Sequence, residues 1–286
     1  EGGEKYKYSL TIREPNPDFQ VTLKGKNATI GSGSGQRLSV SVNRIDGFNG
    51  EVRVEVTGLP KGFTVTSPII IEPDHLSANG VIHASDQVAI TVQPKPAKTK
   101  GKTKSPARAR KPVKDNTDWS KVRVTATGWI NGKKVIKALG TLGNLKVAVA
   151  PKVRVWLEAD PEALPRGKAG NSNELVIAPG TTITAMLRIE RNGFNGDLKF
   201  DVDHLPHGVI VDNIGLSGIL VRAGETRRRV YLTAADWVGE TTHRIHAVGI
   251  GQGNQATLPI TLHVRKNHEV KNTTQNRNLS DKVSTP

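Results

Sequence analysis

Apolar and polar residues alternate with a period of two along most of this chain. Such alternation is typical of strands with one buried face. No stretch shows the 3.6-residue periodicity of an amphipathic helix, so the pattern predicts an all-β fold. The clearest runs are Val40 and Val42; Val52, Val54 and Val56; Val88, Ile90 and Val92; Val122 and Val124; Ile183, Ala185, Leu187 and Ile189; and Leu198, Phe200 and Val202.

The sequence contains an internal repeat. Residues 37–62 recur as residues 183–208: Gly-Phe-Asn-Gly at 47–50 returns at 193–196, and Leu-Pro-x-Gly at 59–62 returns at 205–208. Further along, the alignment pairs Ile90 and Val92 with Val230 and Leu232, and then residues 123–128 with residues 244–249 at a shorter offset. The change of offset predicts an insertion of about 19 residues in the first copy, between Val92 and Arg123.

The repeated motifs have the composition of turns. Asn49-Gly50 and Asn195-Gly196 each lie between two alternating runs. Asn and Gly accept positive φ, so we expect both pairs to form tight hairpin turns. The proline of Leu-Pro-x-Gly cannot donate to a strand ladder, so it ends the strand before it.

About seven short strands in each copy predict two tandem immunoglobulin-like antiparallel β-sandwiches. The first spans residues 15–149 and carries a disordered basic insertion at 94–118, and the second spans residues 150–265. Residues 266–286 are polar and are expected to be a disordered tail or linker. Residues 1–14 are either the end of a preceding module or an N-terminal edge strand of the first sandwich, and the sequence leaves both open.

Composition removes several classes of function. The 286 residues include no Cys, which excludes a disulfide scaffold, a thiolate metal site and a cysteine nucleophile. No apolar run reaches the roughly 18 residues of a membrane helix, so no transmembrane segment is expected. We find no nucleophile elbow and no phosphate-binding loop, and we expect no enzyme activity and no cofactor.

The formal net charge of +15 is concentrated in one segment. Residues 94–114 hold nine Lys and Arg and no acidic residue, with four Pro and no aromatic residue. This run cannot bury enough apolar surface to fold, so it is expected to be a mobile loop. It is either a solvated insertion, which we favour, or a polyanion-binding element. In the second case the binding residues are Lys95, Lys98, Lys100, Lys102, Lys104, Arg108, Arg110, Lys111 and Lys114.

The repeated motifs resemble those of bacterial immunoglobulin-like modules that occur in tandem in large exported and cell-surface proteins. They include modules similar to the NEW3 domain that accompanies some secreted glycosidases. The likeness rests on residues 46–52, 56–65 and 69–73 of the first copy and on residues 192–198, 205–209 and 223–226 of the second. It implies a non-catalytic spacer or adhesion module located outside the cytoplasm. The insertion in the first copy departs from the usual module.

Two groups of polar residues have the composition of a metal site. His204 and His207, and likewise His243 and His246, are three residues apart, but on strands such pairs point to opposite faces. Asp201 and Asp203 share a strand face, as in some calcium sites, but no further carboxylate is close in sequence. We therefore expect a solvated strand face at these aspartates and no metal site at either group.

The tryptophans provide a third candidate. Trp119 and Trp237 occupy similar places before the penultimate strand of each copy, where packing under the sandwich edge is the default expectation. If a pair of them were exposed, it would suit stacking on sugar rings. The sequence alone does not show which tryptophans are exposed.

These observations favour a structural or interaction segment of a larger exported bacterial protein, located in the periplasm, at the cell surface or outside the cell. Its expected partners are other domains of the same polypeptide, and we expect a monomer. Two alternatives stay open. One is a polyanion-binding module that uses the basic run, with acidic polysaccharide or another polyanion as partner. The other is an accessory carbohydrate-binding domain.

Overall fold

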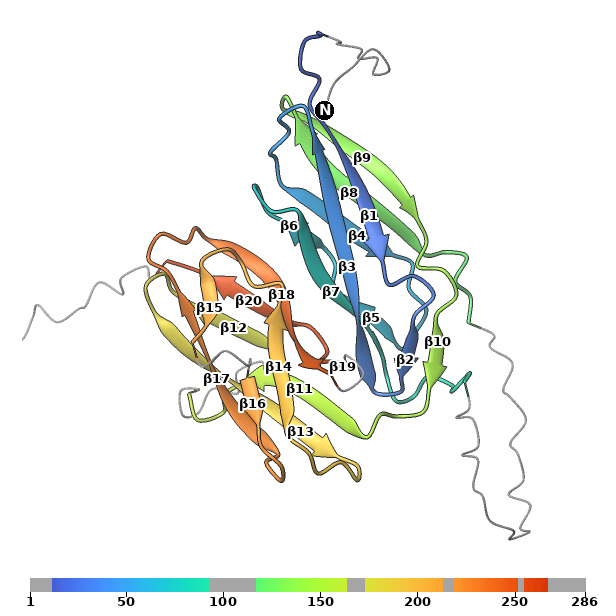
Figure 1. Cartoon of the computed structure of the whole chain (residues 1–286), viewed down its shortest axis with the longest axis vertical. Coiled ribbons are helices and arrows are strands. Elements are labelled where there is room, and N and C mark those ends of the chain that lie inside the picture. The colour runs from blue at the N-terminus through green and yellow to red at the C-terminus, as the bar shows by residue number, and fades with distance from the viewer. Residues whose placement is uncertain (1–11, 93–116, 164–172, 213–218, 252–254, 267–286) are drawn as a thin grey trace, which may run out of the picture.

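The chain folds as an all-β protein with two sandwiches, as the alternating pattern predicts (Figure 1). The computed structural model describes residues 12–92, 117–163, 173–212, 219–251 and 255–266. Within these ranges there are strands and turns and no helix. No helix of the described residues could therefore cross a membrane.

The first sandwich packs two four-stranded antiparallel layers against each other. One layer has the order β1-β3-β7-β5 and the other has the order β6-β4-β8-β9. A short parallel pair, β2 and β10, lies beside them. The strands are β1 (Asp18–Lys24), β2 (Thr29–Gly31), β3 (Ser34–Ile45), β4 (Val52–Thr57), β5 (Phe63–Val65), β6 (Ile69–Ile71), β7 (Ser77–Ala84), β8 (Arg123–Ile130), β9 (Lys133–Gly140) and β10 (Lys146–Ala148).

The second sandwich repeats this plan. One layer has the order β11-β13-β17-β15, and the other joins β12, β20, β18, β14 and β16. The strands are β11 (Val153–Ala159), β12 (Glu174–Ile177), β13 (Thr182–Arg191), β14 (Leu198–Asp203), β15 (Val209–Val211), β16 (Ile219–Val221), β17 (Arg227–Ala234), β18 (Thr241–Ile250), β19 (Gln255–Ala256) and β20 (Ile260–Val264).

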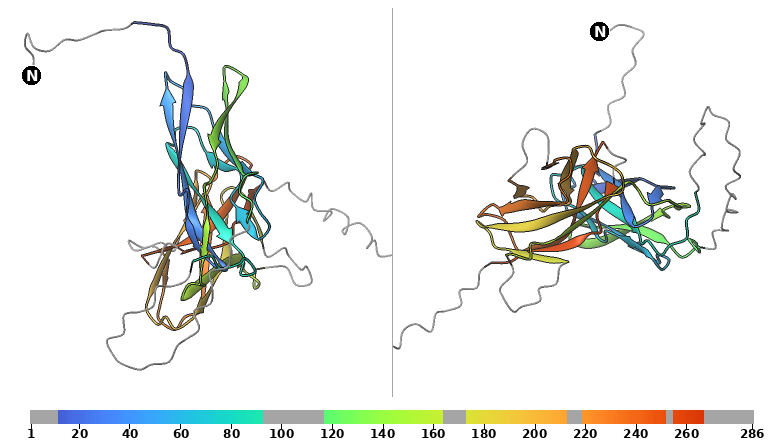
Figure 2. Two further views of the ribbon diagram at one scale, coloured as in Figure 1. Left: turned by 90° about the vertical axis from the view of Figure 1, so that its right-hand side faces the viewer. Right: turned by 90° about the horizontal axis from the view of Figure 1, so that it is seen from below.

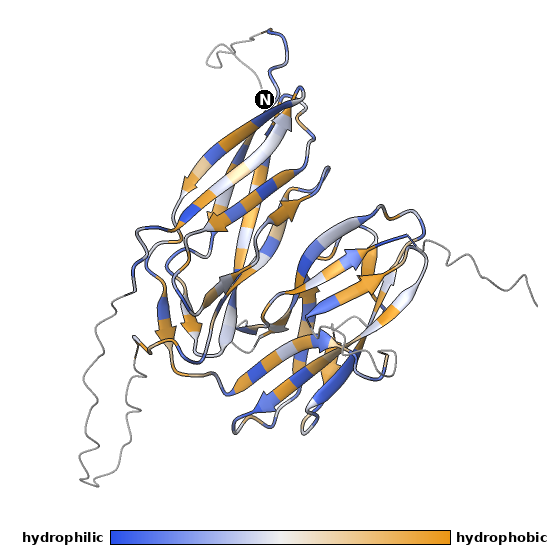
Figure 3. Cartoon of the chain, turned by 180° about the vertical axis from the view of Figure 1, so that it is seen from behind, coloured by the Kyte–Doolittle hydropathy of each residue, from blue (hydrophilic) through white to orange (hydrophobic). Residues whose placement is uncertain are grey.

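Each sandwich has its own hydrophobic core, filled by the inward-facing residues of the alternating runs. In the first core, Leu38, Val54 and Ile71 are fully buried; in the second, Leu187 and Leu262 are. Colouring by hydropathy shows the alternation along the strands (Figure 3). Burial of these apolar side chains is the main force that stabilises both layers.

One predicted strand is wrong. The residues from Val88 to Val92 form no strand apart from a single bridge between Val92 and Ala148. The strand that pairs with β3 in the first sandwich is β7, which ends at Ala84, and its counterpart β17 ends at Ala234. The alignment of Ile90 with Val230 therefore matches a loop with a strand, because apolar and polar residues alternate in both segments.

The predicted turn geometry is also wrong in detail. Positive φ occurs at Asp46 and Gly47 rather than at Asn49 and Gly50, and at Gly193 in the second copy. Gly50 is needed for a different reason: a Cβ there would lie 2.9 Å from the ring of Phe48. The Gly-Phe-Asn-Gly motif thus combines one left-handed glycine with one close approach to an aromatic ring.

The two sandwiches lie in contact, and one sheet runs through both. Strand β19 pairs with β18 of the second sandwich and with the start of β3 in the first, so Ala256 lies opposite both Val248 and Gly35. The second sandwich rests against the lower half of the first, beside β6 and β7, and the two are offset along the long axis of the molecule (Figures 1 and 2).

Candidate functional site: the interface between the sandwiches

The surface between the two sandwiches gathers most of the chemically distinctive side chains of the described chain. We call it the interface. It begins at the β19–β3 pairing, where Val81, Val248 and Ala256 form a small separate apolar cluster. Around this cluster the contacts are polar. They join β3, β6, β7 and the residues after β6 in the first sandwich to β14, the turn after it and β18 in the second. The residues that make these contacts are Arg37, Ile70, Glu72, Asn79, Asp203, His204, His207, His243 and His246.

An ion pair crosses the interface next to the shared sheet. Arg37 Nε donates to Asp203 Oδ2 at 2.7 Å, and the Asp203 side chain is only 10% exposed. His246 Nε2 lies 3.5 Å from the same oxygen. Burial alone raises the pKa of Asp203, but the neighbouring His246 and Arg37 outweigh burial and lower it below its ordinary value.

His204 forms a hydrogen bond between the two sandwiches. It follows β14 at a positive φ of 65°, which turns its ring toward the first sandwich. Its Nε2 accepts a hydrogen bond from the backbone N–H of Ile70 at 2.8 Å, and its Nδ1 lies 2.9 Å from the carbonyl oxygen of Arg244. These partners require a neutral ring with its proton on Nδ1.

His243 lies behind His204 and faces Glu72. The two imidazole rings are 4.9 Å apart between centroids. His243 Nδ1 lies 3.2 Å from the His204 carbonyl oxygen, and its Nε2 lies 3.6 Å from Glu72 Oε1. The other carboxylate oxygen of Glu72 accepts from the backbone N–H of His207 at 2.9 Å. The Glu72 carboxylate thus contacts two residues of the second sandwich, His243 and His207.

Arg44 and the Gly-Phe-Asn-Gly turn of the first sandwich hold Glu72 and His75 in place. Arg44 donates from its guanidinium to the carbonyl oxygens of Glu72 (2.8 Å), His75 (3.0 Å) and Gly50 (2.7 Å). Asn49 Oδ1 accepts from the backbone N–H of Asp74 at 2.8 Å. The Gly-Phe-Asn-Gly loop therefore positions one wall of the interface.

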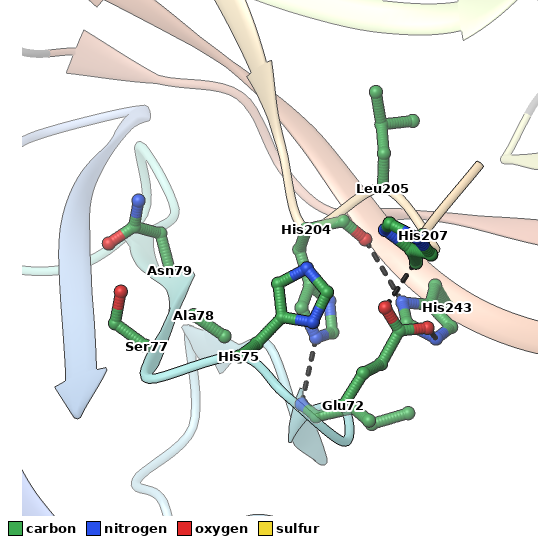
Figure 4. A pocket seen from close by; sticks show the side chains of 10 residues that line it. Glu72, His75, Ser77, Ala78, Asn79, His204, Leu205, His207 and His243 are labelled. Carbon is green, nitrogen blue, oxygen red and sulfur yellow. Dashed lines mark hydrogen bonds and ion pairs between the residues drawn. The ribbon is translucent and has the colours of Figure 1, made fainter. Parts of the chain in front are cut away.

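A small cavity of about 200 Å³ opens at this place (Figure 4). The rings of His75 and His207 both line the cavity, with centroids 5.1 Å apart. Trp237 does not line the cavity but packs next to it, 5.2 Å from the His207 ring between centroids, and is 60% exposed. The lining also includes Glu72 and Asn79, so the cavity combines ring side chains with polar hydrogen-bonding groups.

The structure corrects two sequence-based expectations here. His204, His207, His243 and His246 gather at one interface because β18 is buried on both of its faces there and because His204 and His207 lie in a turn rather than on a strand. Asp203 is not on a solvated strand face, since it is buried against Arg37. The described residues nevertheless contain no group of three or more His, Cys, Asp or Glu arranged to hold a metal ion.

The two tryptophans that sequence reasoning treated alike differ in their surroundings. Trp119 is half-buried, and its ring packs edge-on against Phe63 at 4.8 Å between centroids. Trp237 lies largely in solvent. The default expectation of packing under the edge therefore describes Trp119 and is wrong for Trp237.

The nine basic residues proposed to bind polyanions, from Lys95 to Lys114, lie outside the described residues, so their role stays a prediction. Sequence reasoning missed Arg37, Glu72 and His75 entirely. A usable signal was present: His204 precedes the second Leu-Pro-x-Gly turn and His207 lies within it, and His243 and His246 follow with the same spacing. Nothing in the pattern showed that these segments meet, because the contact is between modules rather than within one.

The fold and the interface define the class of protein as a pair of immunoglobulin-like β-sandwiches in direct contact. No family model and no curated protein sequence matches the chain, so the finer likeness to the NEW3 domain stays a prediction.

Comparison with solved structures finds matches of low sequence identity and low TM-score. Domains 4 and 5 of the S-layer protein SbsC share 14% identity at a TM-score of 0.26, over 50% of this chain and 64% of that one. The Yersinia pseudotuberculosis adhesin InvE shares 11% identity at 0.26, over 88% of this chain and 60% of that one. The fibronectin(III)-like modules of Clostridium thermocellum CbhA share 12% identity at 0.21, over 86% and 94%.

The chain thus spans less than two thirds of the first two of these structures. At such TM-scores the likeness carries no argument about function. The fold is defined by its strand pairing.

Proposed function

We propose that this chain is a non-catalytic structural segment, a spacer or adhesion-type pair of modules in a larger exported protein, which holds two sandwiches at a fixed angle. The observation that carries the proposal is the β19–β3 pairing, because a shared sheet resists rotation far better than side-chain contacts alone. The ion pair of Arg37 with Asp203 and the hydrogen bond of Ile70 with His204 constrain the same contact at further points.

The fixed angle is supported by the variety of the contacts. Backbone pairing, an apolar cluster, an ion pair and a histidine hydrogen bond all cross the interface. Interfaces between domains of one chain are commonly polar and permit relative motion unless they are large and apolar, so the fixed angle depends on the backbone pairing of β19 with β3. A spacer with a fixed angle would set the direction in which neighbouring parts of a polypeptide project.

Electron spin resonance distance measurements test this proposal directly. The chain has no cysteine, so Lys134→Cys on β9 and Lys199→Cys on β14 would carry the only two spin labels. Both lysines are exposed. At about pH 7.5, where ordinary histidines are neutral, we expect one narrow distance distribution. A broad distribution, like that of domains on a flexible linker, would contradict the proposal.

A second candidate function is binding of carbohydrate at the cavity of the interface, which the exposure of Trp237 favours. Sugar rings stack on exposed aromatic faces, and carboxylate and amide groups hydrogen-bond their hydroxyls. His207 lines the cavity, the exposed Trp237 ring lies beside His207, and Glu72 and Asn79 offer the polar groups.

Titration with soluble polysaccharides, monitored by tryptophan fluorescence, tests the second candidate. Binding should quench the fluorescence, and Trp237→Ala should abolish the response. Trp129→Ala is the matched control, since Trp129 is also exposed, at 48%, but lies on β8 of the other sandwich. An equal response of the two variants would remove this candidate.

A further inference from the structure

The interface contains an unusual concentration of histidine for a contact that is largely excluded from water. His243 and His246 are 2% and 0% exposed, and His204 is 9% exposed. Neither ring nitrogen of His246 has a hydrogen-bond partner among the described residues. A buried imidazole that has to stay neutral to keep its hydrogen bonds makes a contact sensitive to protons.

We propose that the interface is a proton-sensitive joint: protonation of His204 breaks its hydrogen bond to Ile70 and releases the second sandwich from the first. The proposal rests on the proposed function, since a joint can open only where the closed arrangement is otherwise fixed. It adds a condition under which the fixed angle is lost.

The hydrogen bonds of His204 explain why this residue is the sensor. Its Nε2 has to be unprotonated to accept from the Ile70 N–H. A proton on Nε2 would place two N–H donors against each other at hydrogen-bond distance, and the backbone of β6 has no freedom to reverse its N–H. The second ring nitrogen already donates to the Arg244 carbonyl oxygen, so a rotated ring would lose that contact as well.

The groups around His204 give a charged ring little compensation. His243 and His246 on β18 both oppose a positive charge on it. Glu72 is the carboxylate of the same cavity, but its oxygens face His243 and the His207 backbone. Asp203 is paired with Arg37. Among the described residues, His75, His207 and Arg244 are further titratable or charged groups close to it, and Glu51 and Arg53 act on the neighbouring His243.

Burial lowers the pKa of His204 from 6.5 to about 4, and burial lowers the pKa of His243 as well, against the opposing effect of Glu72. Because the pKa of His204 is lower in the closed state, its neutral ring stabilises that state above about pH 6.5. This stabilisation is lost as the pH falls from 6.5 toward 4. For His204 alone, acidification to about pH 5 should raise the ratio of open to closed molecules by about 30-fold.

The same spin-labelled chain tests the joint. At about pH 7.5 we expect the single narrow distance, and at about pH 5 a second, longer distance whose share fits the 30-fold change. His204→Gln keeps a side-chain oxygen that can accept from the Ile70 N–H but does not titrate, so its pH response should be clearly smaller than that of the parent, with the remainder coming from His243. His263→Gln is the matched control, because His263 lies on β20 and bonds Thr242 away from the interface, and it should respond like the parent.

The possible results separate the two proposals. A broad distance distribution of the parent at neutral pH would contradict the fixed angle itself. A narrow distribution that stays unchanged at about pH 5 would leave the fixed angle intact and overturn the joint, as would an equal pH response in His204→Gln.

If His204→Gln does not close at neutral pH, two further measurements decide the question. His204→Asn, which tolerates the positive φ better, replaces it. Nuclear magnetic resonance of the imidazole nitrogens in the parent should show His204 as the Nδ1-protonated neutral form down to about pH 5. A His204 ring that titrates at the ordinary pKa of 6.5 in the closed molecule would overturn the proposal.

Discussion

At the scale of single residues, the interface depends on the ion pair of Arg37 with Asp203, whose two side chains differ in exposure. Asp203 is nearly buried, whereas its partner Arg37 is 36% exposed. Removing the negative charge leaves Arg37 free to turn toward water, but it also removes the carboxylate oxygen that lies 3.5 Å from His246 Nε2. Buried ion pairs are costly to break from one side, and exposed pairs contribute little.

Asp203→Asn should therefore lower the free energy of unfolding by about 1–3 kcal/mol, because it removes the charge that faces Arg37 and His246. Urea titration followed by tryptophan fluorescence measures this change. Glu158→Gln is the control: it removes an open pair with Arg188 at 3.5 Å on the outer face of the second sandwich. The control should lose less than about 0.5 kcal/mol, and equal losses would mean that the Asp203 pair contributes no more than a surface pair.

The pH windows of the two interface groups differ, which allows their effects to be separated. The pKa of Asp203 is lowered in the native state, so its stabilising effect is present above its ordinary value of 3.8 and is lost only as the pH falls through the lower native value. The effect of His204 is lost between 6.5 and about 4. Near pH 5 the ion pair is therefore intact while the His204 contact is weakened.

At the scale of elements, alternation predicted most strands because each sandwich buries one face of each strand. β4, β13 and β14 coincide closely with their predicted runs. The false strand at 88–92 arose because a loop alternated by chance, and β7 was missed because its sequence, Ser77 to Ala84, is mixed in polarity. Its inner face packs on the core, but its outer face meets the second sandwich, so no simple alternation marks it.

Strand β19 could not be predicted for a related reason. It has two residues, Gln255 and Ala256, and it is a strand only because β3 and β18 both pair with it. Pairing of this kind depends on how the sandwiches meet, which local sequence does not encode. The site residues Arg37 and Glu72 escaped prediction for the same reason, since each is an ordinary polar residue until the other sandwich lies against it.

Gly35 is the residue that allows β3 and β19 to approach each other. A Cβ at this position would lie 2.6 Å from the Val81 side chain and 2.8 Å from the Ala256 carbonyl oxygen. Gly35→Ala should therefore push β19 off the edge of β3. Hydrogen exchange followed by mass spectrometry should show about tenfold or faster exchange of the peptide that contains Ala256, for a cost of 1–3 kcal/mol.

Gly239→Ala is the control for this substitution, because a Cβ at Gly239 meets nothing within 4 Å. It should leave the exchange of the same peptide unchanged. Unchanged exchange in Gly35→Ala as well would mean that β19 stays paired with β3 despite the added methyl group, and that the close approach does not depend on glycine at position 35.

At the scale of the whole molecule, the net charge of +15 and the interface pose separate questions. The interface combines Arg37 with Asp203 and Glu72 with histidine, so it has no excess of positive charge that would attract a polyanion. The excess is instead concentrated in residues 94–114, which carry nine cationic residues and no acidic one. Polyanion binding would therefore be independent of the angle between the sandwiches.

This independence gives the last prediction. Replacing residues 94–114 with an uncharged Gly-Ser segment of equal length should leave the spin-label distance unchanged, since the contacts described between the sandwiches come from other residues. If the basic run binds polyanions, the replacement should elute from heparin at a clearly lower salt concentration than the parent, because each lost contact with an anionic group reduces the salt dependence of binding. Equal elution would show that the run is a solvated insertion, and a changed distance would show that it also contacts the sandwiches.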